Sequence, residues 1–136
     1  MIDEEQLLHY YKTVINQARE VKEKYPNDFD QVAFLIQEDG SAIILLLTEK
    51  TRRVGEELRD LSRKSHAVIL VEEGNLFFQN GQISFRNLLS SNDGSIVRPC
   101  LRIVLKSRKL QKMTVIPFRQ INERVIFGID ERYSTF

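Results

Sequence analysis

Cysteine and histidine are scarce in this chain of 136 residues, and tryptophan is absent. The single cysteine, Cys100, excludes an intrachain disulfide and a cysteine-based metal cluster. The two histidines, His9 and His66, are not spaced as metal ligands, either with each other or with Cys100. A catalytic role for Cys100 would also need an orienting partner, and none is identifiable. We therefore expect no metal site, no cofactor and no thiol chemistry.

Motifs that bind nucleotides or activate a serine are also missing. The six glycines form neither a dinucleotide fingerprint nor a P-loop, and no Gly-x-Ser-x-Gly elbow occurs. Adjacent acidic pairs occur at Glu38-Asp39, Glu56-Glu57 and Glu72-Glu73. The first and last fall in segments that we interpret as hairpin turns, where solvated acidic residues are common. The sequence favours a protein without catalytic activity, and an enzyme with a site of scattered residues is the third interpretation.

Long apolar runs are absent as well. The longest is Ala42–Leu47, far short of the roughly 18 residues that a membrane-spanning helix needs. Residues 1–5 are acidic in character, whereas a secretory signal begins with basic residues. A lone cysteine also suits a reducing compartment. We expect a cytoplasmic protein without membrane contact.

The composition is that of one globular domain. Hydrophobic residues make up 42% and charged residues 29% of the chain, so we expect a single domain over residues 1–136. The formal net charge of +1 hides an asymmetry, because residues 1–68 hold 13 acidic and 10 basic side chains while residues 69–136 hold 6 acidic and 10 basic ones. No acidic residue occurs from Gly94 to Asn122.

The first half of the chain predicts two helices around a hairpin. Apolar residues at spacings of three and four over residues 3–25 predict an amphipathic helix. Residues 31–37 alternate like a half-buried strand, and a turn at 38–40 leads into residues 41–48, which are largely apolar. Such a continuous apolar strand is typical of a central strand buried on both faces. A second helix with a narrow apolar stripe is expected over residues 50–64.

The second half predicts a β-meander. Residues 67–71 indicate another central strand, and a tight turn is expected at 72–75. Residues 98–106 alternate between apolar and mostly polar positions, and further strands are expected at 113–118 and 125–129. Together the two halves predict an α+β domain with the order helix–strand–strand–helix and then a meander. Its sheet should hold about five to seven strands and be mostly antiparallel, with a mixed sheet left open.

The segment without acidic residues suggests a function. Arg98, Arg102 and Lys106 share one face of the alternating strand, along which alternate residues are about 7 Å apart, close to the spacing of phosphates. The following turn adds more basic residues. We predict backbone contacts to nucleic acid, without base readout, by Arg98, Arg102, Lys106, Arg108, Lys109 and Lys112. The same pattern is also typical of a solvated sheet face.

A protein–protein adaptor or a self-assembly domain is the alternative. The helix expected over residues 50–64 has a charged outer surface, and the hairpins expected over residues 72–85 contain two adjacent phenylalanines. A homodimer that completes a sheet across its interface is compatible with the same pattern. The residues expected at a protein interface are Arg52, Arg53, Arg59, Phe77 and Phe78. The sequence thus predicts a non-catalytic binding or regulatory domain whose partner is nucleic acid or protein.

Overall fold

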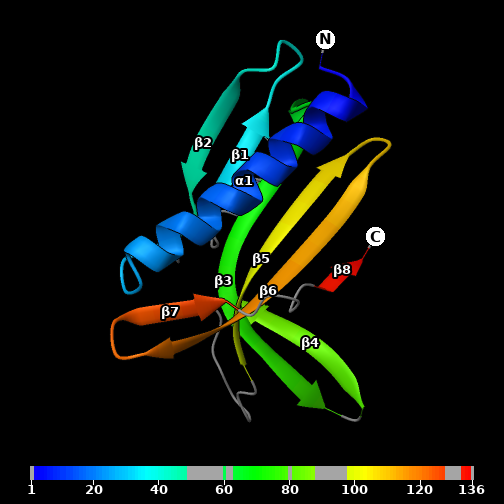
Figure 1. The fold of residues 1–136 in the computed structure, drawn as a ribbon. Helices are drawn as coiled ribbons and strands as arrows, with labels where there is room; N and C mark the ends of the chain where they lie inside the picture. The colour runs from blue at the N-terminus through cyan, green and yellow to red at the C-terminus, as the bar shows by residue number, and fades with distance from the viewer. Residues whose placement is uncertain are drawn as a thin grey trace.

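The computed structural model describes residues 2–48, 60, 63–79, 81–87, 98–127 and 133–135. Within these residues the chain forms one helix and a set of antiparallel strands (Figure 1). The elements are α1 Glu4–Lys24, β1 Val32–Ile36, β2 Ala42–Leu46, β3 Ala67–Gln79, β4 Gln82–Asn87, β5 Arg98–Ser107, β6 Gln111–Ile121, β7 Arg124–Phe127 and β8 Tyr133–Thr135. The α+β class and the antiparallel sheet are therefore as predicted.

Helix α1 begins at a cap that its sequence encodes. The Asp3 side chain accepts a hydrogen bond from the Gln6 backbone N–H at 2.8 Å, and the Gln6 side chain accepts one from the Asp3 N–H at 2.9 Å. This reciprocal pair is a capping box. Acidic residues in the first turn and lysines in the last turn also suit the helix dipole. The helix predicted over residues 3–25 is confirmed.

The strands form one curled sheet with β3 near its centre. The order is β2-β1-β3-β5-β6-β7, and β4 and β8 pair with β3 and β6 respectively. The first part of β3 pairs with β1, its second part pairs with β4, and β5 lies along nearly all of its length. The β3–β4 and β6–β7 hairpins diverge at the end of the sheet away from the N-terminus (Figure 1). The central place predicted for residues 67–71 is confirmed.

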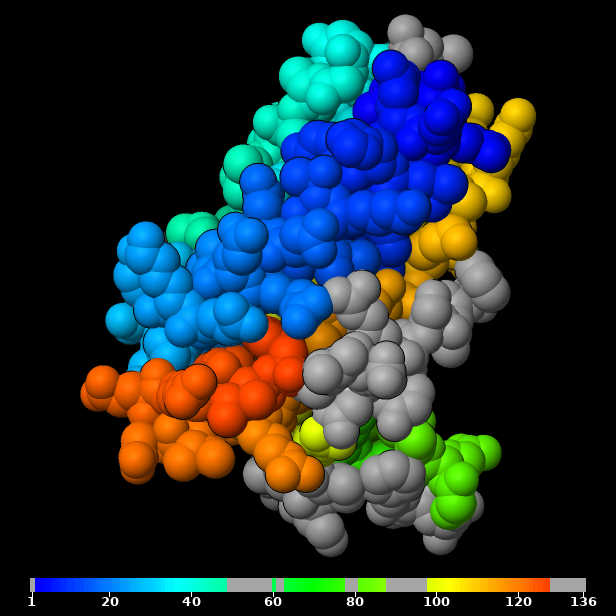
Figure 2. Space-filling model, in the orientation of Figure 1, coloured from blue at the N-terminus to red at the C-terminus, as the bar shows by residue number. Residues whose placement is uncertain are grey.

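Helix α1 lies across one face of the sheet, which we call the helix face, and we call the opposite one the far face. Figure 2 shows α1 over the middle of the molecule and the β1–β2 hairpin, in cyan and teal, extending beyond it on one side. The main core joins α1 to alternate residues of β3, β5 and β6. Leu101, Ile103 and Leu105 of β5 are fully buried in it, which confirms the alternation predicted along this strand.

Strand β2 lies at an edge of the sheet. It pairs with β1 and, within the described part of the chain, with no other strand. Its residues Ile43, Ile44 and Leu46 are 49%, 60% and 56% exposed. The prediction of a central strand over residues 41–48, buried on both faces, is therefore wrong. A continuous apolar run favours burial of a strand, but it does not determine which strands lie beside it in the sheet.

Strand β3 continues through the turn predicted at residues 72–75, and that prediction is also wrong. These residues pair with β5, and Gly74 and Asn75 pair with β4 as well. A Cβ atom on Gly74 would collide with the Arg86 carbonyl oxygen and lie 2.6 Å from the Phe85 ring. Gly74 is therefore needed because β4 approaches the β3 backbone closely. The sequence predicted a turn here because glycine next to acidic residues is common in turns.

The predicted layout with two helices is not matched. The one full helix in the described residues is α1. The helix expected over residues 50–64 lies outside them, except for Asp60, Arg63 and Lys64, which are helical. The strands predicted at 113–118 and 125–129 correspond to β6 and β7, whereas the short strand β8 was not expected.

Candidate functional site

A polar cluster lies on the far face, where β3, β4 and β5 meet the residue before β1. Arg102 is opposite Glu72 in the register, and its Nε and Nη2 donate to Glu72 Oε1 at 3.0 and 2.7 Å. Asn87 Nδ2 donates to Glu72 Oε2 at 2.8 Å and to Gln31 Oε1 at 2.7 Å. The Arg102 guanidinium also stacks on the Phe85 ring at 4.1 Å. One buried carboxylate thus holds several strands together.

The chemistry of this cluster is that of a closed ion-pair network. The side chain of Glu72 is 10% exposed and that of Arg102 is 28% exposed. Within the described residues, no buried side-chain nitrogen or oxygen lacks a hydrogen-bond partner. The same part of the chain contains no group of three or more side chains that could hold a metal ion. The cluster therefore satisfies its own polar groups and supports strand packing.

One residue of the predicted nucleic-acid surface, Arg102, belongs to this cluster. The charge of Arg102 is paired with Glu72 at 2.7 Å. Arg98 and Lys112 are half-buried, and each interacts with another group of the protein. The long basic stripe predicted along β5 is therefore partly occupied by internal contacts, which reduces the positive charge available to a phosphate.

The other three residues of the predicted nucleic-acid surface lie together at one turn. Lys106 is at the end of β5, and Arg108 and Lys109 follow in the turn to β6; all three are exposed. The turn is closed by a hydrogen bond from the Ser107 N–H to the Leu110 carbonyl oxygen at 2.8 Å. These side chains form a compact basic tip, which we call the 106–109 tip.

The residues predicted at a protein interface are described only in part. Phe77 is 5% exposed, and the Arg86 guanidinium lies 5.0 Å from its ring centroid. Phe77 is therefore part of the packed interior. The Phe78 side chain and residues Arg52, Arg53 and Arg59 lie outside the described part of the chain.

A second buried ion pair lies on the helix face. The Lys22 ammonium on α1 contacts Glu73 Oε1 at 2.7 Å, and their side chains are 2% and 16% exposed. Lys22 Nζ also donates to the Pro26 carbonyl oxygen at 2.6 Å and lies 5.0 Å from the Phe118 ring centroid. The sequence predicted a solvated turn at Glu73 and gave no local sign that Lys22 pairs with it, so this pair was missed.

Cys100 is a buried apolar residue rather than a reactive thiol. It is 0% exposed and packs on the far face with Leu76 and Val115. Burial raises the pKa of the Cys100 thiol to about 12, although the nearby Arg102 charge acts in the opposite direction. A thiol in this state is a poor nucleophile at neutral pH.

Strand β2 exposes three large apolar side chains, more than any other strand in the described part of the chain. Ile44 is opposite Phe34 in the register, and the ring centroids of Phe34 and Tyr10 on α1 are 6.2 Å apart. Ile44 and Leu46 therefore lie on the helix face. Ile43 points to the far face. We call Ile43, Ile44 and Leu46 the edge surface. Strand β2 contains no charged residue and no proline, the two kinds of residue that commonly protect edge strands.

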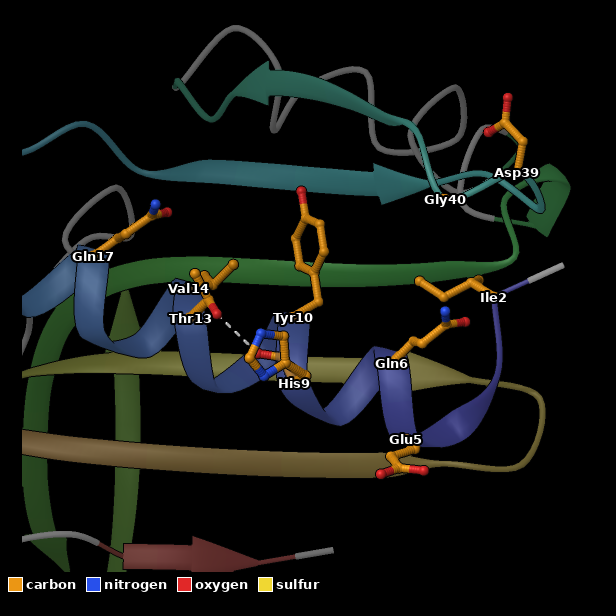
Figure 3. Close-up of a pocket in the computed structure, with 10 residues that line it drawn as sticks. All are labelled: Ile2, Glu5, Gln6, His9, Tyr10, Thr13, Val14, Gln17, Asp39 and Gly40. Carbon is orange, nitrogen blue, oxygen red and sulfur yellow. Dashed lines mark hydrogen bonds between the residues drawn. The ribbon is translucent and has the colours of Figure 1, made fainter.

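An open hollow of about 840 Å³ lies between the first half of α1 and the β1–β2 turn. Figure 3 shows Tyr10 pointing from α1 toward β1, with Glu5 near one end of the helix and Asp39 in the turn. Hydrogen bonds from the Ser41 side chain and backbone lower the pKa of Asp39. The hollow therefore has the Tyr10 ring on one side and, in the turn, a carboxylate whose pKa is lowered.

The described residues contain no helix that is both long enough and apolar enough to cross a membrane. Comparison with known protein families, with curated proteins and with solved structures finds no match.

Proposed function

We propose that this chain is a non-catalytic binding domain that associates with another protein through the edge surface of β2. The observation that carries the proposal is the exposure of Ile43, Ile44 and Leu46 on an edge strand. Edge strands expose unpaired backbone N–H and C=O groups, and proteins usually protect them with charges, prolines or bulges. A bare apolar edge is therefore best explained if a partner covers it in the working state.

Three ionisable groups inside the sheet are consistent with a role in binding. Glu72 and Glu73 are each engaged by a cation, and Cys100 is buried. Such a molecule offers a partner surfaces and an edge, and its buried polar groups maintain the shape of that edge. The hydrogen bonds of β3 with β1 and β5 fix the position of β1, which in turn holds β2.

The proposal is tested by placing a photo-crosslinking amino acid at position 44 in the full chain, in cells that naturally produce the protein. Ile121 supplies a matched control, because it is 58% exposed and Ile44 is 60% exposed. We expect protein adducts, identified by mass spectrometry, from position 44 and not from position 121. Equal yields at both positions, or no adduct at position 44, would contradict the proposal.

Contact with nucleic acid is a second candidate function, favoured by the exposure of the 106–109 tip. Residues 98–127 contain eight basic and one acidic side chain, so a phosphate backbone approaching this side meets a positive surface. We expect any such binding to be weak, independent of sequence and strongly dependent on salt.

The test is a titration of labelled single- and double-stranded oligonucleotides at two salt concentrations. The variant carries Lys106→Glu, Arg108→Glu and Lys109→Glu, and leaves Arg102 in its ion pair. Its control carries Arg119→Glu and Arg124→Glu, two exposed positions on β6 and β7. Loss of binding in the first variant alone supports this function, whereas equal binding by both variants and the wild type contradicts it.

A further inference from the structure

The hydrogen bonds of the β1–β2 hairpin determine which backbone groups of β2 face outward. The Gln37 N–H donates to the Ser41 carbonyl oxygen and the Leu47 N–H donates to the Gln31 carbonyl oxygen, both at 2.8 Å. Backbone groups alternate in direction along a strand, so the odd-numbered residues of β2 bond to β1. The N–H and C=O groups of the even-numbered residues, Ala42, Ile44 and Leu46, therefore point away from β1, to the edge of β2 that pairs with no other strand among the described residues.

These outward groups provide a template for one more strand. Every pairing in the described sheet is antiparallel, and antiparallel pairing is the slightly more stable form. A segment that pairs with Ile44 places the side chain opposite it on the helix face, beside Ile44 and Leu46. Its intervening side chains lie on the far face, beside Ile43. The added segment should therefore carry apolar residues, at least at alternate positions.

The charge around β2 selects the chemistry of that segment. Residues 1–48 contain nine acidic and four basic side chains. Glu38 and Asp39 are exposed in the β1–β2 turn, and the exposed Glu5 lines the hollow next to it (Figure 3). In an antiparallel pair with a second copy, the two acidic turns lie at opposite ends, and residues 41–48 of that copy bring no basic side chain to either turn. A basic segment is attracted to the same place.

We propose that the partner supplies an extended segment that adds to β2 as an antiparallel strand, with apolar residues opposite Ala42, Ile44 and Leu46 and basic residues beside the β1–β2 turn. This inference rests on the proposed function and specifies the ligand of the same edge. In an antiparallel pair, the carboxyl end of the added segment lies beside the start of β2. The basic residues therefore follow the apolar ones in the partner's sequence.

The experiment uses the full chain and the synthetic peptide acetyl-Thr-Ile-Thr-Val-Thr-Ile-Lys-Lys-amide. Binding is measured from amide chemical shifts in NMR spectra and by calorimetry. We expect a dissociation constant of about 0.1–1 mM for this short peptide, with the shifts centred on β2. Replacing both lysines by glutamates should weaken binding by roughly tenfold or more.

Two controls separate strand pairing from adhesion to an apolar surface. A peptide with N-methylated valine lacks the N–H that would donate to the outward Ile44 carbonyl, so it should not bind. Ile44→Pro removes the outward N–H of residue 44 and leaves the hydrogen bonds of β2 with β1 in place. This variant should keep the circular dichroism of the wild type and lose peptide binding, whereas Ile121→Pro should keep peptide binding. The N-methylated peptide gives the answer even if a proline variant fails to fold.

The outcomes distinguish this inference from the proposed function. Equal binding of the lysine and glutamate peptides, or no binding of the lysine peptide at about 1 mM, overturns the inference. Self-association of the wild type in light scattering, abolished by Ile44→Pro, also overturns it, because the occupant is then a second copy and only the proposed function stands. If neither peptide binding, self-association nor crosslinking depends on position 44, both the inference and the proposed function are wrong.

Discussion

Glu72 and Glu73 are adjacent in β3, and their carboxylates lie on opposite faces of the sheet. Glu73 faces α1 and pairs with Lys22, whose side chain is 2% exposed. Glu72 faces the other way and pairs with Arg102, whose side chain is 28% exposed. The two pairs have the same N–O distance of 2.7 Å. The pairs differ in the type of cation and in the degree to which water reaches it, and we expect water access to decide their contributions to stability.

The helix-face pair should be the more sensitive of the two. Lys22→Met leaves the Glu73 carboxylate largely buried without its cation and removes the hydrogen bond to the Pro26 carbonyl oxygen. We expect the free energy of unfolding to fall by about 3–5 kcal/mol, measured by urea denaturation. The double variant Lys22→Met and Glu73→Leu should recover most of this loss, because it removes the unpaired charge. A double variant as unstable as the single one would show that packing around Lys22, not charge burial, dominates.

The far-face pair should lose less stability than the helix-face pair when its cation is replaced by methionine. Arg102→Met leaves Glu72 with the hydrogen bond from Asn87, and water reaches this side of the pair more easily. We expect a loss of about 1–3 kcal/mol in the same urea experiment. Arg102→Lys should fall between the methionine variant and the wild type, because lysine keeps the charge but not the planar stacking on Phe85. A loss larger than that of Lys22→Met would reverse the ranking of the two faces.

Titration of Cys100 tests the far face without changing the ion pair. The folded-state pKa of this thiol is about 12, above its ordinary value of 9.0. The unfolded chain therefore releases the proton first, and stability is present in full below pH 9 and declines as the pH rises toward 12. We expect a loss of about 1–2 kcal/mol between pH 8 and pH 10, measured by urea denaturation. Cys100→Ala should remove this dependence.

The helix face also has a group that titrates in alkali, which limits the range of that measurement. Burial raises the pKa of Tyr11 above its ordinary value of 10.0, so its contribution to stability begins to fall only above pH 10. The Tyr11 hydroxyl lies 3.0 Å from the Ile103 carbonyl oxygen and 2.6 Å from Thr114 Oγ1. Below pH 10, a remaining decline in the Cys100→Ala variant would show that a different group carries the effect.

The sequence correctly predicted which side of α1 and of β5 is buried, but not which strands and side chains lie next to each other in the fold. The apolar stripe of α1 and the alternation of β5 record which side of an element is buried, and both were confirmed. The position of β2 depends on which strands flank it, which periodicity does not encode. Glu72 and Glu73 were missed for a related reason. Two adjacent carboxylates before a glycine indicate a solvated turn locally, and only the register with β5 and the approach of Lys22 show that both are paired within the fold.

The candidate basic surface shows the same limit. Alternation correctly placed Arg98, Arg102 and Lys106 on one face of β5, but the acidic residue opposite Arg102 lies thirty positions away in the sequence. Pairing at that distance leaves no local pattern. Residues at a turn have fewer neighbours, and the exposure of Arg108 and Lys109 could be predicted from their place between two strands.

An exposed carboxylate supplies the reference for both buried pairs, and here we expect the smallest effect. Asp39 accepts hydrogen bonds from the Ser41 N–H and hydroxyl at 2.9 and 2.6 Å, which lower its pKa below 3.8. Its contribution to stability is therefore present above pH 3.8 and is lost as the pH falls through the lower folded-state pKa. Asp39→Asn should be slightly less stable than the wild type at neutral pH and equal to it in strong acid, measured by thermal unfolding at both pH values. A difference that persists in acid would mean that the turn depends on the shape of residue 39 and not on its charge.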